Sequence, residues 1–501
     1  MSELETLKIH LARVADLDAA ANVLEWDQET YMPDGATEAR AHQIATLRKL
    51  SHEFFTSDEV GGLLETLAPE VEELDVYSDA RSLIRVARRD YDKATKVPAS
   101  LVAEMAEAVA LGKQAWKAAR ETNTFATFAP HLEKLVDLNL QKAEALGYED
   151  RRYDALLDQY EPGMRTSEVE QVFRDLRRDL VPIVQAIAEH EPPADAFLHQ
   201  PFDEQKQWNF GVDVIRSFGY SFKHGRQDRS AHPFTTSFSV SDVRLTTRVD
   251  PRFFPTAFFG TLHEAGHGLY EQGISPSLNR TPLADGTSLG MHESQSRLWE
   301  NLIGRSQAFW QYHYRILQER FPEALQDVPL ETFYRGINRV APSLIRVEAD
   351  EVTYNLHIML RFELETAMIS GDLAVKDLPE AWNAKTEDYL GLRPKTDADG
   401  VLQDVHWSLG ALGYFPTYAL GNLMSVQLFE QARADVEGLD EQIGRGSFSG
   451  LLAWLREHVH QHGRKKTAGD ILQDVVGGGL DAEPWLAYIR QKYGALYGPL
   501  P

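Results

Sequence analysis

The 501-residue sequence contains no cysteine. Disulfide bonds, thiolate metal ligands and a cysteine nucleophile are therefore excluded. Long hydrophobic runs are also missing, since no stretch approaches the roughly 18 apolar residues of a membrane-spanning helix. The N-terminal segment is acidic and lacks the basic and then apolar character of a signal peptide. We therefore expect a cytoplasmic protein without a membrane partner.

Positive charge is scarce. The 51 Lys and Arg residues face 76 Asp and Glu residues, which gives a formal net charge of −25. Such a balance argues against a groove for nucleic acid and against binding to an anionic membrane surface. The length exceeds that of a single hydrophobic core, so two lobes are expected. We treat residues 1–501 as one catalytic unit made of two helical lobes.

Helical periodicity dominates the chain. Apolar residues recur at three- and four-residue intervals near the N-terminus, and residues 36–160 are charged, helix-periodic and free of repeats. Residues 219–250 differ, because β-branched and aromatic residues alternate there around Ser241-Asp242. The pattern predicts a mainly α fold with a small antiparallel β-sheet. That sheet could be a structural hairpin, or an edge strand that pairs with an extended peptide.

One five-residue sequence, from His263 to His267, indicates a metal-binding site. His263 and His267 flank Glu264-Ala265-Gly266 in an H-E-x-x-H sequence, and Pro255 and Gly273 suit the first turn and the end of a helix. Residues four positions apart share a helix face, so both imidazoles can bind one cation. Glu264 is then placed to act on a water molecule as a base. The alternative is a helix whose two histidines fill polar gaps.

A catalytic metal site needs a third protein ligand, with one position left for water. A new helix is predicted to start near Ser288, and it carries His292 and Glu293. The chain has room after His267 to end its helix, turn and present a carboxylate. We favour Glu293 as the third ligand, and His292 is the alternative.

Two later segments carry further candidates. Arg346 precedes Glu348 and Asp350, and this group could also be a surface ion-pair cluster. His406 precedes a glycine-rich, aromatic run that contains Tyr414 and Tyr418. Histidine and tyrosine donors in such a loop suit stabilisation of an oxyanion, although packing roles are equally typical.

These segments together resemble the thermostable carboxypeptidase (carboxypeptidase Taq) family of metallocarboxypeptidases. The similarity extends over nearly the whole chain. The matching stretches are Trp26-Asp27-Gln28, His232-Pro233-Phe234, Asp242-Val243-Arg244-Leu245-Thr246, the pentad from His263 to His267, His292-Glu293-Ser294-Gln295, Ile345-Arg346-Val347-Glu348-Ala349-Asp350 and Gly400 through Trp407.

The resemblance implies a two-lobed helical shell around a deep active-site groove, with the small sheet beside the metal helix, and usually a homodimer. It implies one divalent metal ion per chain, with Zn²⁺ preferred and Co²⁺ as the alternative, held by His263, His267 and Glu293. Glu264 would be the general base, and His406 or Tyr418 would stabilise the oxyanion. Substrate-binding roles would fall to Arg346, which suits a terminal carboxylate, and to His232 and Tyr414.

The expected activity is therefore release of single C-terminal residues, with broad specificity, from peptides that have a free carboxylate. Two alternatives stay open. A helical metallo-oligopeptidase would cut short peptides internally, and a catalytically silent helical protein would only bind its partner.

Overall fold

The structure is a computed structural model that describes residues 2–501. It divides into two compact units, each assembled from three stretches of the chain. Unit 1 combines the residues up to Thr95 with Ala194–Ile337 and Leu428–Gly479. Unit 2 combines Lys96–Pro193, Asn338–Gln427 and Leu480–Pro501. Because both units are discontinuous in sequence, composition alone shows no boundary between them.

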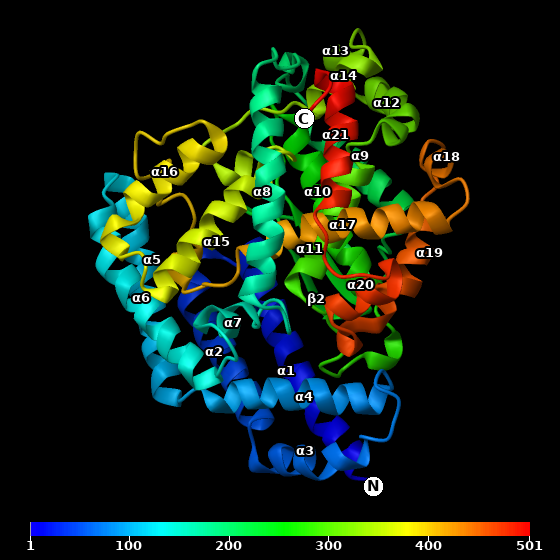
Figure 1. The fold of residues 1–501 in the computed structure, drawn as a ribbon. Helices are drawn as coiled ribbons and strands as arrows, with labels where there is room; N and C mark the ends of the chain where they lie inside the picture. The colour runs from blue at the N-terminus through cyan, green and yellow to red at the C-terminus, as the bar shows by residue number, and fades with distance from the viewer. Residues whose placement is uncertain (1) are drawn as a thin grey trace. The chain divides into compact units, whose positions relative to one another are not determined.

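Unit 1 holds the N-terminal helices, the sheet and the H-E-x-x-H helix (Figure 1). Its helices are α1 (Glu3–Thr30), η1 (Asp34–Ala36), α2 (Thr37–Phe55), α3 (Asp58–Glu70), α4 (Asp79–Lys96), η2 (Ala196–Leu198), α9 (Glu204–Phe218), α10 (Phe254–Gly273), η3 (Pro276–Leu278), α11 (Leu289–Arg297), η4 (Leu298–Ile303), α12 (Gln307–Arg320), α13 (Pro322–Leu325), α14 (Leu330–Ile337), α18 (Leu439–Ile443), α19 (Ser449–His458), η8 (His460–Lys465) and α20 (Ala468–Val476).

Unit 2 is built from helices alone. They are α5 (Ala99–Thr122), α6 (Phe125–Leu146), α7 (Arg152–Leu157), α8 (Thr166–Ala188), η5 (Arg346–Glu348), α15 (Tyr354–Ser370), η6 (Val375–Asp377), α16 (Leu378–Leu390), η7 (His406–Leu409) and α21 (Glu483–Tyr497). The long helix α17 (Pro416–Asp435) begins in unit 2 and ends in unit 1. The C-terminal α21 lies beside α8, so the last helix of the chain is packed into unit 2 (Figure 1).

The mainly α fold with a small sheet is confirmed, and the antiparallel pairing predicted around Ser241-Asp242 is found for two of the three strands; the third pairing is parallel. The strands β1 (Gly225–Arg229), β2 (Thr235–Ser239) and β3 (Asp242–Thr247) lie in the order β1-β3-β2. β2 and β3 are antiparallel, whereas β1 and β3 are parallel, so the sheet is mixed. Alternation identifies strands but not their neighbours. The short link after Ser239 makes β2 and β3 a hairpin, and the longer loop after β1 lets β3 take the central place.

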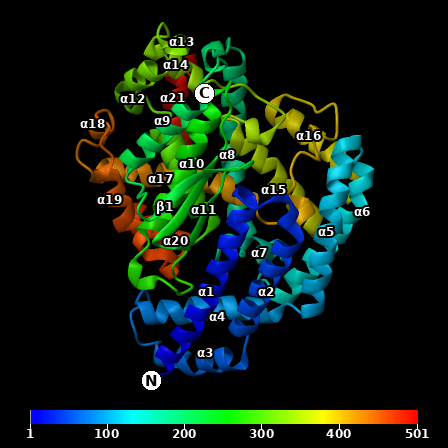
Figure 2. The ribbon, with the colours of Figure 1, turned by 180° about the vertical axis from the view of Figure 1, so that it is seen from behind.

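The sheet packs against α10. Both β2 and β3 contact this helix, and the strands cross it in the view of Figure 2. Val243 and Leu245 of β3 are fully buried, as expected for the central strand. Burial of these side chains fixes the register of the sheet on the helix, because a one-residue slip would expose them. The sheet therefore lies against the helix that carries two of the predicted metal ligands.

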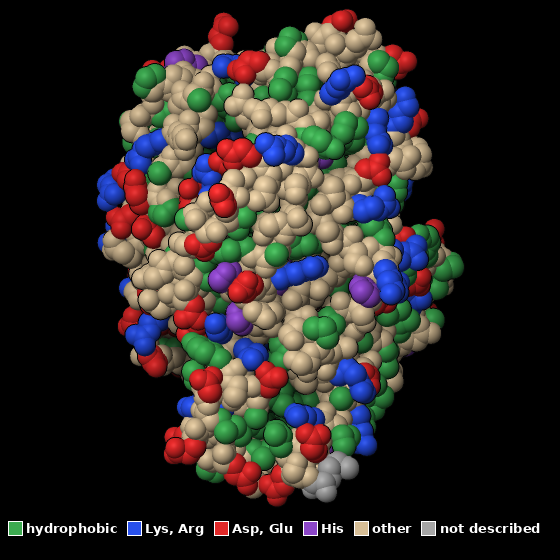
Figure 3. Space-filling model, turned by 90° about the vertical axis from the view of Figure 1, so that its right-hand side faces the viewer, with side chains coloured by type: hydrophobic (Ala, Val, Ile, Leu, Met, Phe, Trp, Pro, Cys, Tyr) green, Lys and Arg blue, Asp and Glu red, His purple; other side chains and the backbone are tan. Residues whose placement is uncertain are grey.

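Apolar helix faces account for the rest of the packing. In unit 1, one buried cluster joins α1, α3 and α4 through the side chains Leu7, Leu11, Val60, Leu64, Leu67, Leu83 and Ile84. Among the helices of residues 2–501, none combines the length and apolar character needed to cross a membrane. On the face shown in Figure 3, acidic and basic side chains are interspersed.

Candidate active site

The pentad lies in the second half of α10. This helix runs from Phe254 to Gly273 with Pro255 in its first turn, as the sequence predicts. Gly266 allows the neighbouring helix to approach closely. A Cβ atom at this position would lie 2.5 Å from the carbonyl oxygen of Gln295 and 2.6 Å from Cα of Ser296. Glycine within the pentad thus lets the backbone of α11 pack directly on α10.

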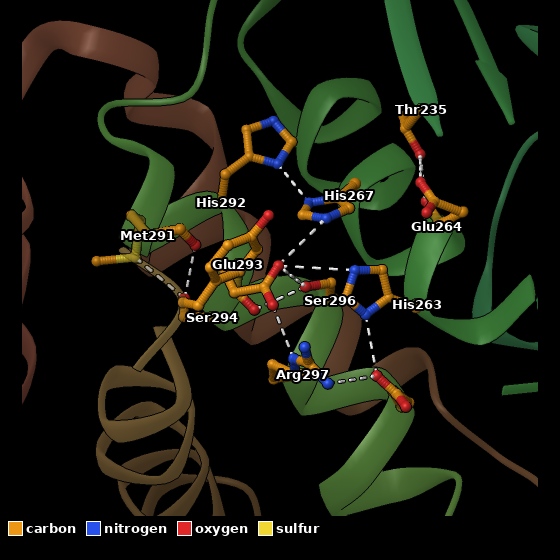
Figure 4. A network of polar contacts seen from close by, with 12 residues as sticks. Thr235, His263, Glu264, His267, Met291, His292, Glu293, Ser294, Ser296 and Arg297 are labelled. Carbon is orange, nitrogen blue, oxygen red and sulfur yellow. Dashed lines mark hydrogen bonds and ion pairs between the residues drawn. The ribbon is translucent and has the colours of Figure 1, made fainter. Parts of the chain in front are cut away.

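Helix α11 supplies the third candidate ligand. The hydroxyl of Ser288 caps it by accepting from the backbone N–H of Met291, so the helix starts where the sequence predicts. Glu293 then points toward both histidines of α10 (Figure 4). Its Oε2 lies 3.6 Å from Nε2 of His263 and 3.6 Å from Nε2 of His267.

This arrangement fits a single divalent cation. One ligand atom from each of His263, His267 and Glu293 lies within 4.8 Å of the others. Atoms bound about 2.1 Å from a shared tetrahedral cation lie roughly 3.4 Å apart. Two imidazoles and one carboxylate also match a hydrolytic zinc set that leaves one position open. The donor chemistry and the spacing therefore agree.

The carboxylate of Glu293 is held by its own helix. Arg297, one turn later, donates from Nε to Oε1 at 2.7 Å, and Ser296 Oγ lies 3.0 Å from Oε2. Because Arg297 occupies Oε1, Oε2 is the oxygen presented to the two imidazoles. The geometry favours binding through one oxygen only.

The outer nitrogen of His263 contacts a second carboxylate. Its Nδ1 lies 2.9 Å from Oε2 of Glu300, which belongs to the π-helical segment η4. Arg297 also donates to this oxygen at 3.2 Å. Burial would raise the pKa of Glu300, but Arg297 and His263 outweigh it and lower the pKa to about 2. Glu300 is therefore ionised, and it fixes His263 with Nδ1 protonated and Nε2 facing Glu293.

The outer nitrogen of His267 contacts a histidine instead. Its Nδ1 lies 2.6 Å from Nδ1 of His292, whose Nε2 lies 2.7 Å from Oε1 of Glu271. If Nε2 of His267 is a ligand, its Nδ1–H donates to His292, and His292 donates onward to Glu271. Burial also lowers the pKa of His267, which favours the neutral form that a metal ligand requires. His292 thus lies behind His267 and is not one of the three converging residues.

Glu264 is turned toward the sheet. Its Oε2 accepts a hydrogen bond from Thr235 Oγ1 of β2 at 2.7 Å (Figure 4). The side chain is buried, and burial raises its carboxyl pKa although His263 and Thr235 act in the opposite direction. A carboxylate with a raised pKa accepts a proton more readily, as a general base must.

Arg346 lies in unit 2, next to Asp404. Arg346 donates from Nε and Nη2 to Oδ1 of Asp404 at 2.9 and 2.8 Å, and from Nη1 to the hydroxyl of Tyr354 at 3.0 Å. Arg361 donates to the other oxygen at 2.7 Å. The ion-pair alternative for Arg346 is therefore present, but its partner is Asp404 and the cluster is buried.

His406 and both tyrosines form one aromatic group in unit 2. Nε2 of His406 lies 3.4 Å from the hydroxyl of Tyr418, and the Tyr414 ring packs against both residues. Burial lowers the pKa of His406 to about 4, so its imidazole is neutral at physiological pH. His232 instead lies in unit 1, exposed in the loop before β2, and its carbonyl accepts from Ser230 Oγ.

Sequence reasoning missed several contacting residues. Arg297 and Glu300 follow Glu293 by four and seven positions, so they share its helix face, and that spacing could have identified them. Thr235, Glu271 and Asp404 carried no comparable signal. Each is distant in sequence from the residue it contacts, and only the tertiary fold brings the pairs together.

Comparison with known proteins agrees with this geometry. The family described as "Carboxypeptidase Taq (M32) metallopeptidase" matches residues 6–493. "Thermostable carboxypeptidase 1" of Thermus thermophilus is 43% identical, with 97% of each chain covered. "Carboxypeptidase 1" of Bacillus subtilis is 39% identical, again with 97% of each chain covered. The crystal structure of an M32 carboxypeptidase from Deinococcus radiodurans is 44% identical, with a TM-score of 0.97 over 99% of this chain and 100% of that one. The chain belongs to the carboxypeptidase Taq (M32) family of metallopeptidases.

Proposed function

We propose that this protein is a metal-dependent carboxypeptidase that releases single C-terminal residues from peptides with broad specificity. The observation that carries the proposal is the convergence of His263, His267 and Glu293, with Glu264 held beside them. Family membership supports a metallocarboxypeptidase. We add two features that family membership alone does not supply: the removal of one residue at a time and broad specificity for the side chain removed.

The three converging side chains would hold one divalent cation, with Zn²⁺ preferred. The same set of nitrogen and oxygen ligands also accepts Co²⁺, so either ion could support activity. When bound, such an ion polarises the scissile carbonyl and makes a nucleophile of water at neutral pH. Glu300 and His292 would keep both imidazoles in the orientation and tautomer that binding requires.

Glu264 would act as the general base and then as the acid. Among residues 2–501, no side chain hydrogen-bonds its Oε1, whereas Oε2 is held by Thr235. Oε1 is thus free to take the proton of the attacking water. The same proton would pass to the leaving amine as the peptide bond breaks.

Arg346 remains our candidate for the terminal carboxylate of the substrate. Asp404 orients its guanidinium group. Arg346 and Arg361 each carry one positive charge and Asp404 carries one negative charge, so these three side chains have a net charge of one positive unit. Burial lowers the pKa of His406 and of His357 to about 4 and about 3, so neither histidine adds a charge at neutral pH. Glu365 also interacts with Arg361, and its pKa is about 7, so the surplus is complete when Glu365 is protonated. A surplus positive charge in a buried cluster suits a carboxylate ligand.

His406 and Tyr418 are our candidates for donors to the oxyanion, with Tyr414 as a further substrate contact. A neutral imidazole and a phenol can each donate one hydrogen bond to developing negative charge. His232 is proposed as a substrate contact because it is exposed next to β2, the strand that holds Glu264. A homodimer and a cytoplasmic location are also proposed, from the family resemblance and the composition.

Peptide pairs with free and amidated C-termini test the activity. A carboxypeptidase releases the last residue of an N-blocked dipeptide or longer peptide only when the carboxylate is free. A metallo-oligopeptidase cuts longer peptides whether or not they are amidated, and a silent binding protein cuts neither. Equal cleavage of the free and amidated forms would overturn our proposal. The assay should be run after dialysis against a chelator and again after addition of Zn²⁺ or Co²⁺.

A further inference from the structure

Thr235 makes two contacts with Glu264 through its hydroxyl group. Its Oγ1 lies 2.7 Å from the carboxylate oxygen Oε2 and 2.9 Å from the backbone carbonyl oxygen of the same residue. Thr235 begins the edge strand β2, and Glu264 lies within α10, so the contact joins the sheet to the helix. In the described residues, this hydroxyl is the one side-chain partner of the Glu264 carboxylate.

A hydroxyl carries one hydrogen, so it can donate to only one of these two oxygens at a time. When Glu264 is ionised, the shorter contact and the negative charge favour donation to Oε2. When Oε2 carries a proton, the hydroxyl can accept from it and turn its own hydrogen to the backbone carbonyl. When the proton is on Oε1, donation to Oε2 continues. The hydroxyl therefore has a hydrogen bond to make in every protonation state of Glu264.

We propose that Thr235 is a positioning residue that holds the Glu264 carboxyl in place through both halves of the proton transfer. The inference rests on the proposed role of Glu264. In the first half, an O–H bond of water breaks and an O–H bond forms on Glu264. In the second half, that bond breaks and an N–H bond forms on the leaving amine. Without Thr235, the flexible glutamate side chain would have to be ordered at each turnover, and misplacement of about 1 Å can cost about 100-fold in rate.

The test compares four variants of the full-length, metal-loaded protein. Thr235→Val removes the hydroxyl at nearly constant volume, Thr235→Ala is a second removal, and Thr235→Ser retains the hydroxyl. Thr236→Val is the matched control, because the next residue of a strand points to the opposite face. For each variant, kcat and KM for an N-blocked peptide, the Kd for Zn²⁺ and the thermal unfolding midpoint are measured.

We expect Thr235→Val and Thr235→Ala to lower kcat by about 10- to 100-fold, while KM, the metal Kd and the unfolding midpoint stay close to those of the parent protein. Thr235→Ser should restore most of the lost kcat, and Thr236→Val should behave like the parent. Equal loss in the serine and valine variants would mean that the methyl group matters, which would overturn the inference. A fall in metal affinity that accounts for the loss of kcat would also overturn it.

Glu264→Gln separates the two proposals. If this variant is inactive while Thr235→Val turns over normally, the positioning role is wrong and the proposed function stands. If Glu264→Gln itself retains normal turnover, the base is misassigned, and the inference about Thr235 falls with it.

Discussion

Nδ1 of His263 lies 2.9 Å from the carboxylate oxygen Oε2 of Glu300, and both side chains are largely shielded from solvent. The contact ties the helix of the pentad to the π-helical segment that follows α11. π-Helical turns are rare and are often found at functional sites. Here the turn carries the carboxylate that fixes one imidazole of the candidate metal site.

Loss of Glu300 should weaken metal binding. Glu300→Ala removes the partner of Nδ1, so His263 can rotate or change tautomer, and we expect the Kd for Zn²⁺ to rise about 10- to 100-fold. Glu300→Gln, which keeps an acceptor without the charge, should have a smaller effect. The Kd is measured by competition with a chelator, with the exposed Glu319→Gln as the control. An unchanged Kd in Glu300→Ala would exclude this role.

The third ligand can be identified by metal analysis. Glu293→Ala should lose most of the bound metal, because it removes one of three converging donors. His292→Ala should lower affinity by a smaller factor, since it removes only the support behind His267. Metal content after gel filtration distinguishes the two. A greater loss in His292→Ala than in Glu293→Ala would reverse the assignment.

Glu264→Gln should separate metal binding from turnover. The amide cannot accept the proton of water, so kcat should fall by about two to four orders of magnitude. The metal content should not change, because Glu264 lies outside the converging set. Steady-state kinetics and metal analysis on the same preparation check both statements. Metal loss in this variant would show that Glu264 supports the ligands as well.

Arg346→Lys should weaken recognition of the free carboxylate. Lysine keeps the charge but loses the planar fork, so we expect KM for an N-blocked peptide to rise about tenfold or more. Arg393→Lys is a control, since Arg393 is a partly exposed residue of unit 2 that pairs with Glu380 and Glu387. If KM stays constant while the unfolding midpoint falls, Arg346 serves only as a partner of Asp404.

Glu365 should make the stability of unit 2 depend on pH. Burial raises its pKa to about 7, although hydrogen bonds from Tyr153, Gly413 and Trp407 oppose the shift. Between the unfolded pKa of 4.5 and about 7, the folded protein keeps this proton and the unfolded chain releases it. The contribution is therefore fully present below pH 4.5, and it is lost as the pH rises through 7.

The size of this loss follows from the pKa difference and is about 3 kcal/mol in order of magnitude. Glu365→Gln mimics the neutral acid, so its stability should fall less than that of the parent between pH 4.5 and 7. Denaturant unfolding at several pH values measures the difference, with the exposed Glu121→Gln as the control. Parallel curves for Glu365→Gln and the parent would contradict the prediction.

Local patterns in the sequence predicted the elements that carry the metal ligands. Pro255 and Gly273 marked the helix of the pentad, and Ser288 marked the start of the next one. These predictions succeed because capping and periodicity act within a few residues. The antiparallel pairing of β2 with β3 follows from the short Ser241-Asp242 turn, whereas the parallel pairing of β1 with β3 was not predicted, because alternation gives no information about which strands become neighbours.

The sequence by itself determined the absence of cysteine chemistry, the mainly helical fold, the family resemblance and the two histidines of the candidate metal set, with Glu293 and His292 as the choices for the third ligand. Each of these depends on residue type and short-range spacing. Only the tertiary structure decided that Glu293 rather than His292 faces both imidazoles. It also decided that Glu300 contacts His263 and that Thr235 contacts Glu264. The pairing of Arg346 with Asp404 likewise appears only in the tertiary structure. The physical reason is that these contacts depend on which helix faces meet and how closely. One such contact is the close approach of α10 and α11 at Gly266, where a Cβ atom would lie 2.5 Å from the carbonyl oxygen of Gln295.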